Sequence, residues 1–239
     1  MIYNIQKDTF GPLGTRMGDL VAIVNIVQYL RIKWQDPQLQ FHFYPGSINR
    51  EDYVHKFLMF LTRATDCFSL AHGEKYLPWK NVGVWDYRDI SGDHVKINNF
   101  YAPEKKVVVF PLYDAEYNVQ RNWSIEALYK ILEECNTFYP DHKKVICAKD
   151  KPPANIDIHG FEISTDFLTN IHHVMTAEVF YGGDTGVTHL ASAIRPRPKV
   201  LNYVYGSHCM IHTLPFYYIS EHSGNLRTFW LDFTGAAWE

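Results

Sequence analysis

The residues between 177 and 194 (AEVFYGGDTGVTHLASAI) combine a glycine turn with polar side chains that could bind a ligand. The segment runs from an apolar stretch through the turn into a helical pattern. Such a turn lets the backbone approach a ligand closely and directs free N–H groups and the positive end of a helix toward it, most often at a phosphate. A turn whose glycines serve only packing is the alternative, and the polar content favours a ligand. The candidate binding residues are Asp184, Thr185, Gly186, Thr188 and His189.

A second candidate lies near the amino terminus, where Asp19 follows a loop over residues 7–17 that contains two glycines. A carboxylate in this position could act as a general base that accepts a proton from a substrate hydroxyl. The structural alternative is an aspartate that the helix dipole stabilises in the first turn of a helix. That alternative is the commoner one for a single aspartate considered alone.

A third candidate is Arg121, which stands with Trp123 just before a helical pattern that begins after Ser124. An arginine guanidinium there could bind a phosphate through two parallel hydrogen bonds. The alternative is a surface arginine with the tryptophan packed beneath it. The two interpretations are evenly matched on these residues alone.

The sequence does not contain the motifs of several other enzyme classes. It has no HExxH, no P-loop and no GxSxG element, and it also has no DxD, which argues against metal-assisted handling of a diphosphate. Cys209 and His212 form a single CxxH pair without a second pair at zinc-finger spacing. His172 and His173 are adjacent on a predicted helix, so they face different sides and suit a core or solvent role better than one metal. We therefore expect no metal site and no cofactor.

Composition narrows the class of protein further. The formal charge of −3 over 239 residues gives no general electrostatic argument for nucleic acid or an anionic membrane, although a local basic groove is compatible with it. The four cysteines form no CxxC pair, which is typical of reduced thiols in a cytoplasmic protein. The amino terminus shows no signal peptide, and no apolar stretch is long enough to span a bilayer, so we expect a cytoplasmic protein.

The elements that position these candidates alternate between strand and helix patterns in both halves of the chain. The pattern predicts two consecutive βαβ-rich halves, and thus an α/β fold with two Rossmann-like domains whose parallel sheets face a cleft. Ser124 and Thr165 are the expected helix caps of the second half, and Tyr53 is expected to point inward from a helix of the first half. The expected strands lie at 2–5, 39–44, 67–70, 82–85, 106–110, 144–148, 179–181 and 199–203, and the expected helices at 20–34, at 51–62, after Ser124 and after Thr165.

Three islands of sequence together resemble the heptosyltransferase-like glycosyltransferases (family 9). The first, Gly18-Asp19-Leu20 before a helix, is similar to the amino-terminal GD motif of that family. The second, Arg121-Asn122-Trp123, resembles its basic-x-Trp element. Residues 183–191 (GDTGVTHLA) resemble its D-[ST]-G-x-x-H-x-A segment, which is the most specific of the three. The order and rough spacing of the islands agree with the family.

The resemblance implies a GT-B architecture and an inverting, metal-independent transfer of a sugar from a nucleoside-diphosphate sugar, such as a UDP-sugar. It implies that Asp19 is the catalytic base, that Arg121 lies on the diphosphate, and that Asp184 and His189 contact the sugar and phosphate region. It also implies that the backbone and side chains of Thr185 to Thr188 hold the phosphates at the end of the helix. The implied domains are an acceptor-side domain at 1–104, a nucleotide-sugar domain at 105–215, and a carboxyl-terminal segment at 216–239 that packs back on the first domain.

The acceptor and the activity itself leave alternatives open. In scale and architecture the chain also resembles the small glycosyltransferases with which tailed phages decorate hydroxymethylated bases in DNA. The acceptor is therefore either a saccharide or such a base, and a phage enzyme would act in the host cytoplasm. A nucleotide-sugar-binding protein without catalysis and a nucleotide-sugar epimerase of the same architecture are the two other hypotheses.

Overall fold

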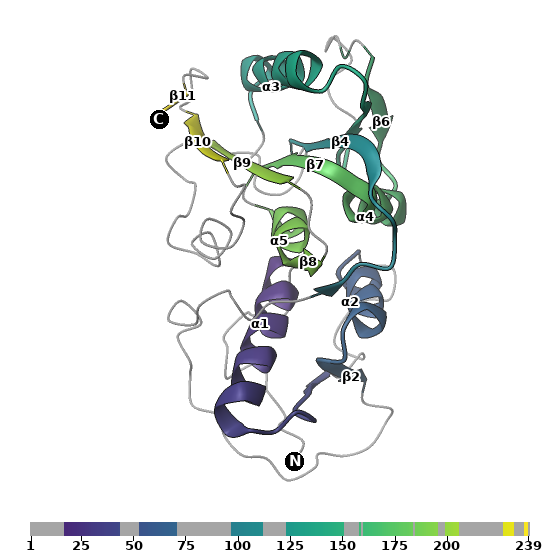
Figure 1. The fold of residues 1–239 in the computed structure, drawn as a ribbon, viewed down its shortest axis with the longest axis vertical. Helices are drawn as coiled ribbons and strands as arrows, with labels where there is room; N and C mark the ends of the chain where they lie inside the picture. Colours follow the sequence, from purple (N-terminus) through teal and green to yellow (C-terminus); the bar gives the residue numbers. More distant parts are fainter. Residues whose placement is uncertain are drawn as a thin grey trace. The chain divides into compact units, whose positions relative to one another are not determined.

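The computed structural model of the protein describes residues 17–43, 53–70, 97–111, 123–150, 158, 160–183, 185–195, 199–205, 227–231 and 237–238 (Figure 1). The chain divides into two compact units, Met1–Asn98 and Asn99–Glu239. Both units contain helices and parallel strands, so the expected mixed α/β class with parallel sheets is confirmed.

The first unit contains a long apolar helix and a short parallel pair of strands. Its elements are α1 (Met17–Trp34), β1 (Phe41–Phe43), α2 (Tyr53–Ala64), β2 (Phe68–Leu70) and β3 (Ile97–Asn98). Strands β1 and β2 pair in parallel, with α2 as the connection between them. The helices and the strands at 39–44 and 67–70 are confirmed, whereas the strands expected at 2–5 and 82–85 lie outside the described residues.

One expectation about α2 is wrong. Tyr53 was expected to point inward, but it is 42% exposed, and the neighbouring Val54 is buried instead. Phe57, Leu58 and Leu61 of the same helix are also buried. The apolar face of α2 begins one residue later than the sequence indicated, because a tyrosine in the first turn can keep its ring at the surface with its hydroxyl in water.

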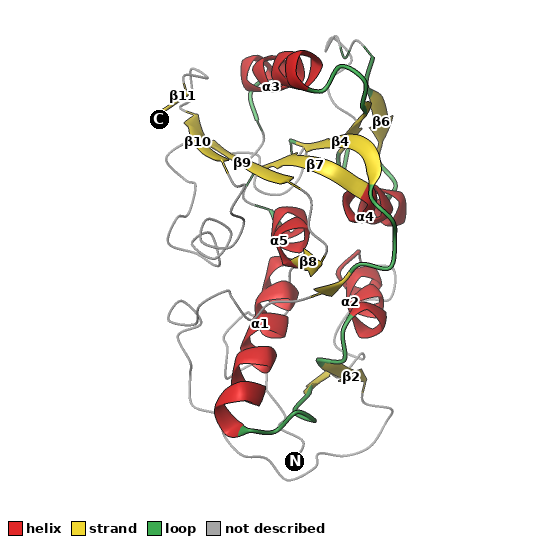
Figure 2. Cartoon of the chain, in the orientation of Figure 1, coloured by secondary structure: helices red, strands yellow, loops and turns green. Residues whose placement is uncertain are grey.

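The second unit is built around a seven-stranded sheet (Figure 2). Its strands are β4 (Glu104–Phe110), β5 (Lys143–Cys147), β6 (Glu162–Ser164), β7 (Ala177–Gly182), β9 (Lys199–Tyr205), β10 (Arg227–Leu231) and β11 (Ala237–Trp238). Its helices are α3 (Ile125–Phe138), α4 (Phe167–Thr176) and α5 (Gly186–Ala193), and the short strand β8 (Ile194–Arg195) follows α5 directly. The strands that we expected at 106–110, 144–148, 179–181 and 199–203 are all confirmed.

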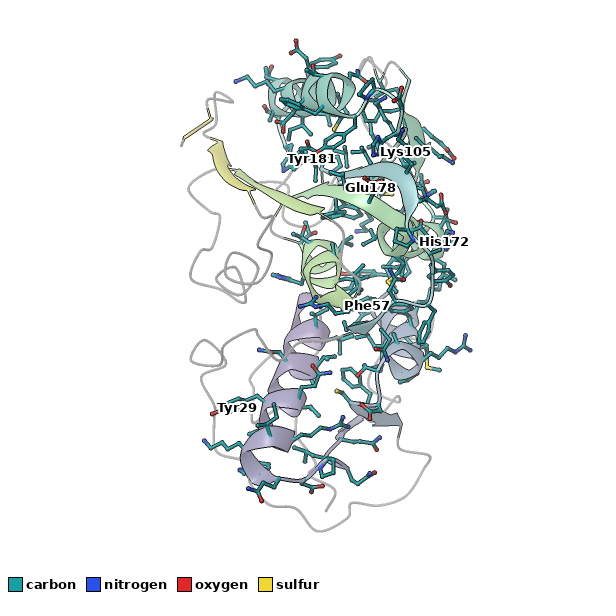
Figure 3. All side chains as sticks on the ribbon, in the orientation of Figure 1. Tyr29, Phe57, Lys105, His172, Glu178 and Tyr181 are labelled. Carbon is teal, nitrogen blue, oxygen red and sulfur yellow. The ribbon has the colours of Figure 1, made fainter. Side chains whose placement is uncertain are left out.

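The helices cover the two faces of this sheet separately. Helix α3 lies on one face, and α4 and α5 lie on the other (Figure 1). Alternate residues of β4 and β7 face α3, so Val107, Val109 and Tyr181 pack with its buried side. The Tyr181 hydroxyl donates to Glu134 Oε1 over 3.1 Å (Figure 3). A sheet covered on both faces explains why its central strands are almost continuously apolar.

The helix caps of this unit are partly as expected. The Ser124 hydroxyl accepts a hydrogen bond from the N–H of Ala127, so Ser124 caps α3 as predicted. The cap predicted for α4 is wrong, because Asp166, not Thr165, precedes the first helical residue. Asp166 Oδ1 accepts from both the N–H and the hydroxyl of Thr169, over 2.8 and 2.6 Å. A carboxylate here can satisfy two donors and also suits the positive end of the helix.

The carboxyl-terminal strands add to the same sheet. Strand β10 pairs in parallel with β9, and β11 pairs antiparallel with β10 at one edge. No strand pattern predicted these two strands. The expected packing of the segment 216–239 on the first domain stays a prediction, as do the expected domain boundaries.

Candidate functional site

Strands β4 and β7 are neighbours at the point where the order of the sheet reverses. From one edge the order is β6-β5-β4-β7-β9-β10-β11. If the six parallel strands of this sheet are numbered along the chain, their order across the sheet is 3-2-1-4-5-6. Doubly wound dinucleotide-binding sheets have this order, so the sheet is compatible with a Rossmann-like fold. Ligands of such sheets bind beyond the carboxyl ends of the strands at this reversal.

The carboxyl ends of the two strands lie at the same level. Phe110, the last residue of β4, pairs with Gly182, the last residue of β7. The turn that the sequence analysis singled out thus begins where the strand order predicts a ligand. This agreement between the turn and the reversal of strand order comes from the structure, since no residue of the turn determines which strand lies beside β7.

The turn from β7 into α5 is closed by two threonines. Thr185 is the residue before α5, and its hydroxyl oxygen accepts a hydrogen bond from the N–H of Thr188 over 3.2 Å. The Thr188 hydroxyl donates to the backbone carbonyl of Gly183 over 2.5 Å. The two hydroxyl oxygens lie 3.2 Å apart. Because the single proton of Thr188 is used on Gly183, Thr185 is the donor of this pair.

Both threonine hydroxyl protons are therefore used inside the turn. The side chains are buried, Thr188 completely so. This arrangement assigns them the task of holding the first turn of α5 in place. The ligand-facing groups that remain are on the backbone, because the N–H groups of Gly186 and Val187 donate to no acceptor among the described residues. Unpaired N–H groups in the first turn of a helix, together with its dipole, attract an anion.

Gly182 makes the close packing of this turn possible. A Cβ on Gly182 would lie 2.5 Å from Phe180 Cε1 and would overlap Thr188 Oγ1. The Thr188 side chain therefore occupies the space that any other residue at 182 would need. This role of Gly182 was not predicted, and the pair of adjacent glycines at 182 and 183 is the one signal in the sequence that indicates it.

The remaining candidates of this turn have different positions. His189 follows Thr188 in α5, and its imidazole is buried. The backbone N–H of His189 donates to the backbone carbonyl of Thr185 over 3.2 Å. Asp184 lies outside the described residues. The structure thus brings together Thr185, Gly186, Thr188 and His189.

Arg121 also lies outside the described residues, but the two ends of its segment are described. Pro111 directly follows β4, and its carbonyl accepts a hydrogen bond from the N–H of Trp123 over 3.3 Å. Trp123 is buried in the core beside α3. Trp123, two residues after Arg121, is thereby tied to the carboxyl end of β4.

Asp19 belongs to the other unit. It is the third residue of α1, in the first turn of the helix, and its side chain is outside the described part of the structure. Its position in the helix agrees with both interpretations of this residue, the general base and the aspartate that the helix dipole stabilises.

Within the described ranges, no group of three or more histidine, cysteine, aspartate or glutamate side chains could hold a metal ion. No described helix combines the length and the apolar character that crossing a bilayer requires. The fold and the turn thus define a parallel α/β protein with a candidate anion site at the reversal of its strand order. Comparison with protein-family models, curated proteins and solved structures finds no match for the chain.

Proposed function

We propose that the protein is an inverting, metal-independent glycosyltransferase of GT-B architecture that uses a nucleoside-diphosphate sugar as donor. The observation that carries the proposal is the β7–α5 turn, whose first helical N–H groups have no acceptor among the described residues. The turn lies at the carboxyl end of β7, next to β4, where the strand order reverses. The same residues form the most specific island of resemblance to the family 9 glycosyltransferases.

In this proposal the donor diphosphate binds at the first turn of α5. The N–H groups of Gly186 and Val187 donate to its oxygens, and the buried threonines keep these groups in place. Arg121 pairs with the diphosphate, and Asp184 and His189 contact the sugar and its phosphate. Backbone N–H groups with an arginine stabilise the leaving diphosphate without a metal ion.

Asp19 is the base of the proposed reaction. It accepts the proton of the acceptor hydroxyl while the hydroxyl oxygen attacks the anomeric carbon from the side opposite the diphosphate. The new bond from oxygen to carbon forms as the bond from the anomeric carbon to the phosphate oxygen breaks, and the nucleoside diphosphate leaves with the electron pair. A direct displacement of this kind inverts the anomeric centre.

The proposed acceptor is either a saccharide or a hydroxymethylated base in phage DNA, and the proposed compartment is the cytoplasm. A DNA acceptor requires contacts to phosphates, so binding to duplex DNA would weaken steeply as salt is added, and the base would have to leave the helix stack. A saccharide acceptor has no such salt dependence. Titration of the protein with hydroxymethylated duplex DNA at two salt concentrations separates the two acceptors.

The test begins with the donor. We would screen nucleoside-diphosphate hexoses, pentoses and heptoses by thermal shift, then offer the donor that binds together with saccharides and with hydroxymethylated DNA. Transfer to one of them supports the proposal. Binding without transfer to any acceptor would identify a nucleotide-sugar-binding protein, and conversion of the donor without an acceptor would identify an epimerase.

Three variants test the assigned residues. Asp19→Asn should abolish transfer and leave the affinity for the donor nearly unchanged. Asp141→Asn, which changes an exposed aspartate, is its control. Arg121→Ala and His189→Ala should weaken nucleoside-diphosphate binding in titration calorimetry, with the exposed Arg63→Ala as control. Unchanged turnover in Asp19→Asn would show that Asp19 is not the base. Wild-type affinity for the nucleoside diphosphate in both other variants would show that Arg121 and His189 do not form the phosphate site.

A further inference from the structure

Helix α4 continues into β7 without a loop, because the helix ends at Thr176 and the strand begins at Ala177. A buried lysine of β4 holds this junction. Lys106 is 1% exposed, and its Nζ donates to Thr176 Oγ1 over 2.6 Å and pairs with Glu104 Oε2 at 2.8 Å. The Thr176 hydroxyl in turn donates to the carbonyl of His172 over 2.9 Å. The ammonium group therefore lies at the negative end of α4, where a cation is favourable.

His173 lies three residues before Thr176, so both side chains are on the same side of α4. The imidazole of His173 is 7% exposed, and its Nδ1 accepts from or donates to no group among the described residues. Its neighbour His172 is exposed and stacks edge-on against Tyr101, with ring centroids 4.8 Å apart (Figure 3). The prediction that these two histidines face different sides and suit core and solvent roles is thus confirmed.

Several charged groups of the sheet act on His173. Lys106 of β4 pairs in register with Lys143 of β5, and Lys143 Nζ is 2.8 Å from Glu162 Oε2 of β6. Burial lowers the pKa of His173 most, the positive charges of Lys106 and Lys143 lower it further, Glu162 opposes them, and His172 adds a smaller lowering. The neutral imidazole is the form that this environment accepts.

We propose that His173 is a pH-sensitive switch for the packing of α4: the helix packs on β4, β5 and β7 with the imidazole neutral, and protonation loosens α4 and its junction with β7. A proton on His173 would add a third positive charge beside Lys106 and Lys143. Both ring nitrogens would then be donors, and Nδ1 would be a buried donor with no acceptor among the described residues. Helix α4 and its junction with β7 would therefore loosen in mild acid.

The pH range over which the switch acts follows from the direction in which the pKa of His173 is shifted. The pKa of His173 in the folded protein is below the ordinary value of 6.5, so the unfolded chain binds more protons between the two values. Stability therefore falls as the pH decreases from 6.5 toward the folded pKa. Glu104 and Glu162 have pKa values below their ordinary 4.5, because each pairs with a lysine, so their loss of stability begins in stronger acid.

Thermal unfolding of the wild type, His173→Gln and His172→Gln at about pH 7.5 and about pH 5.5 tests the switch. The melting temperature of the wild type and of His172→Gln should fall between the two pH values, and that of His173→Gln should fall by at least about 2 °C less. An equal fall in all three proteins would overturn the proposal. His172→Gln is the matched control, because it removes an exposed histidine from the adjacent position.

Two measurements on the wild type keep the proposal testable if His173→Gln does not fold. Titration of the histidine Cε1–H signals by NMR should give His173 a midpoint below the ordinary value of 6.5, and a midpoint at or above that value would overturn the proposal. Hydrogen exchange, corrected for its intrinsic pH dependence, should show that protection falls in peptides of 167–176 but not in those of 125–138 as the pH decreases. Equal changes in the two helices would also contradict the switch.

Discussion

The hydroxyl of Thr188 donates a hydrogen bond to the backbone carbonyl of Gly183 over 2.5 Å, and its side chain occupies the space above Gly182. This contact joins the first turn of α5 to the end of β7. It fixes where the N–H groups of Gly186 and Val187 point, and those groups are the candidate anion site. The threonine thus connects the packing of the sheet to the proposed chemistry.

Thr188→Val tests this contact, since valine keeps the shape of threonine and removes the hydroxyl. The carbonyl of Gly183 would then be buried without its donor, which should lower the free energy of unfolding by about 1–3 kcal/mol. Urea denaturation measures the loss. Thr188→Ser, which keeps the hydroxyl and removes the methyl group, should retain most of the stability that Thr188→Val loses. A loss in Thr188→Ser as large as that in Thr188→Val would show that the methyl group contributes as much as the hydrogen bond. If the proposed donor binds, Thr188→Val should also weaken it.

Gly182→Ala tests the steric part of the same contact. The added Cβ would lie 2.5 Å from the Phe180 ring and would overlap the Thr188 hydroxyl, so the variant should lose about 1–3 kcal/mol of stability. The double variant Gly182→Ala/Thr188→Ala should lose less than the sum of the two single variants, because the smaller side chain at 188 makes room. Additive losses in urea denaturation would mean that the two residues do not share this space.

The cap of α4 gives a prediction with a control in the adjacent residue. Asp166→Ala should lower the free energy of unfolding by about 1 kcal/mol, because the N–H and the hydroxyl of Thr169 both lose their acceptor. Thr165→Ala should change it by less than about 0.5 kcal/mol, since Thr165 is exposed and does not cap the helix. Chemical denaturation of the two variants decides between the caps, and a larger loss in Thr165→Ala would restore the sequence-based assignment.

The described cysteines should be unreactive in the folded protein. Cys67, Cys135 and Cys147 are buried, and burial raises the pKa of each thiol above its ordinary 9.0. The reactive thiolate is therefore scarce near neutral pH. Alkylation with iodoacetamide, followed residue by residue with mass spectrometry, should modify these three only when urea unfolds the chain. Rapid labelling of any of them under native conditions would contradict the described burial.

Local patterns predicted most of the elements. The apolar spacing of α1 and α3 and the apolar runs of β4, β5 and β7 were visible in the sequence, because burial of one helical face or of a whole strand imposes a period that neighbouring residues reveal. Errors occurred where two adjacent residues could perform the same task. Thr165 and Asp166 can both cap a helix, and Tyr53 and Val54 can both begin an apolar face.

The sequence by itself determined the mixed α/β class, the glycine turn and the polar residues that make the turn a candidate site. The tertiary structure alone decided that β7 lies between β4 and β9, that β10 and β11 extend the same sheet, and that Thr188 packs over Gly182. Strand order depends on contacts between residues that are far apart in the chain, and no local period records them. It also decided which histidine of the pair at 172 and 173 is buried, since both occupy the same helix and only the position of the sheet distinguishes them.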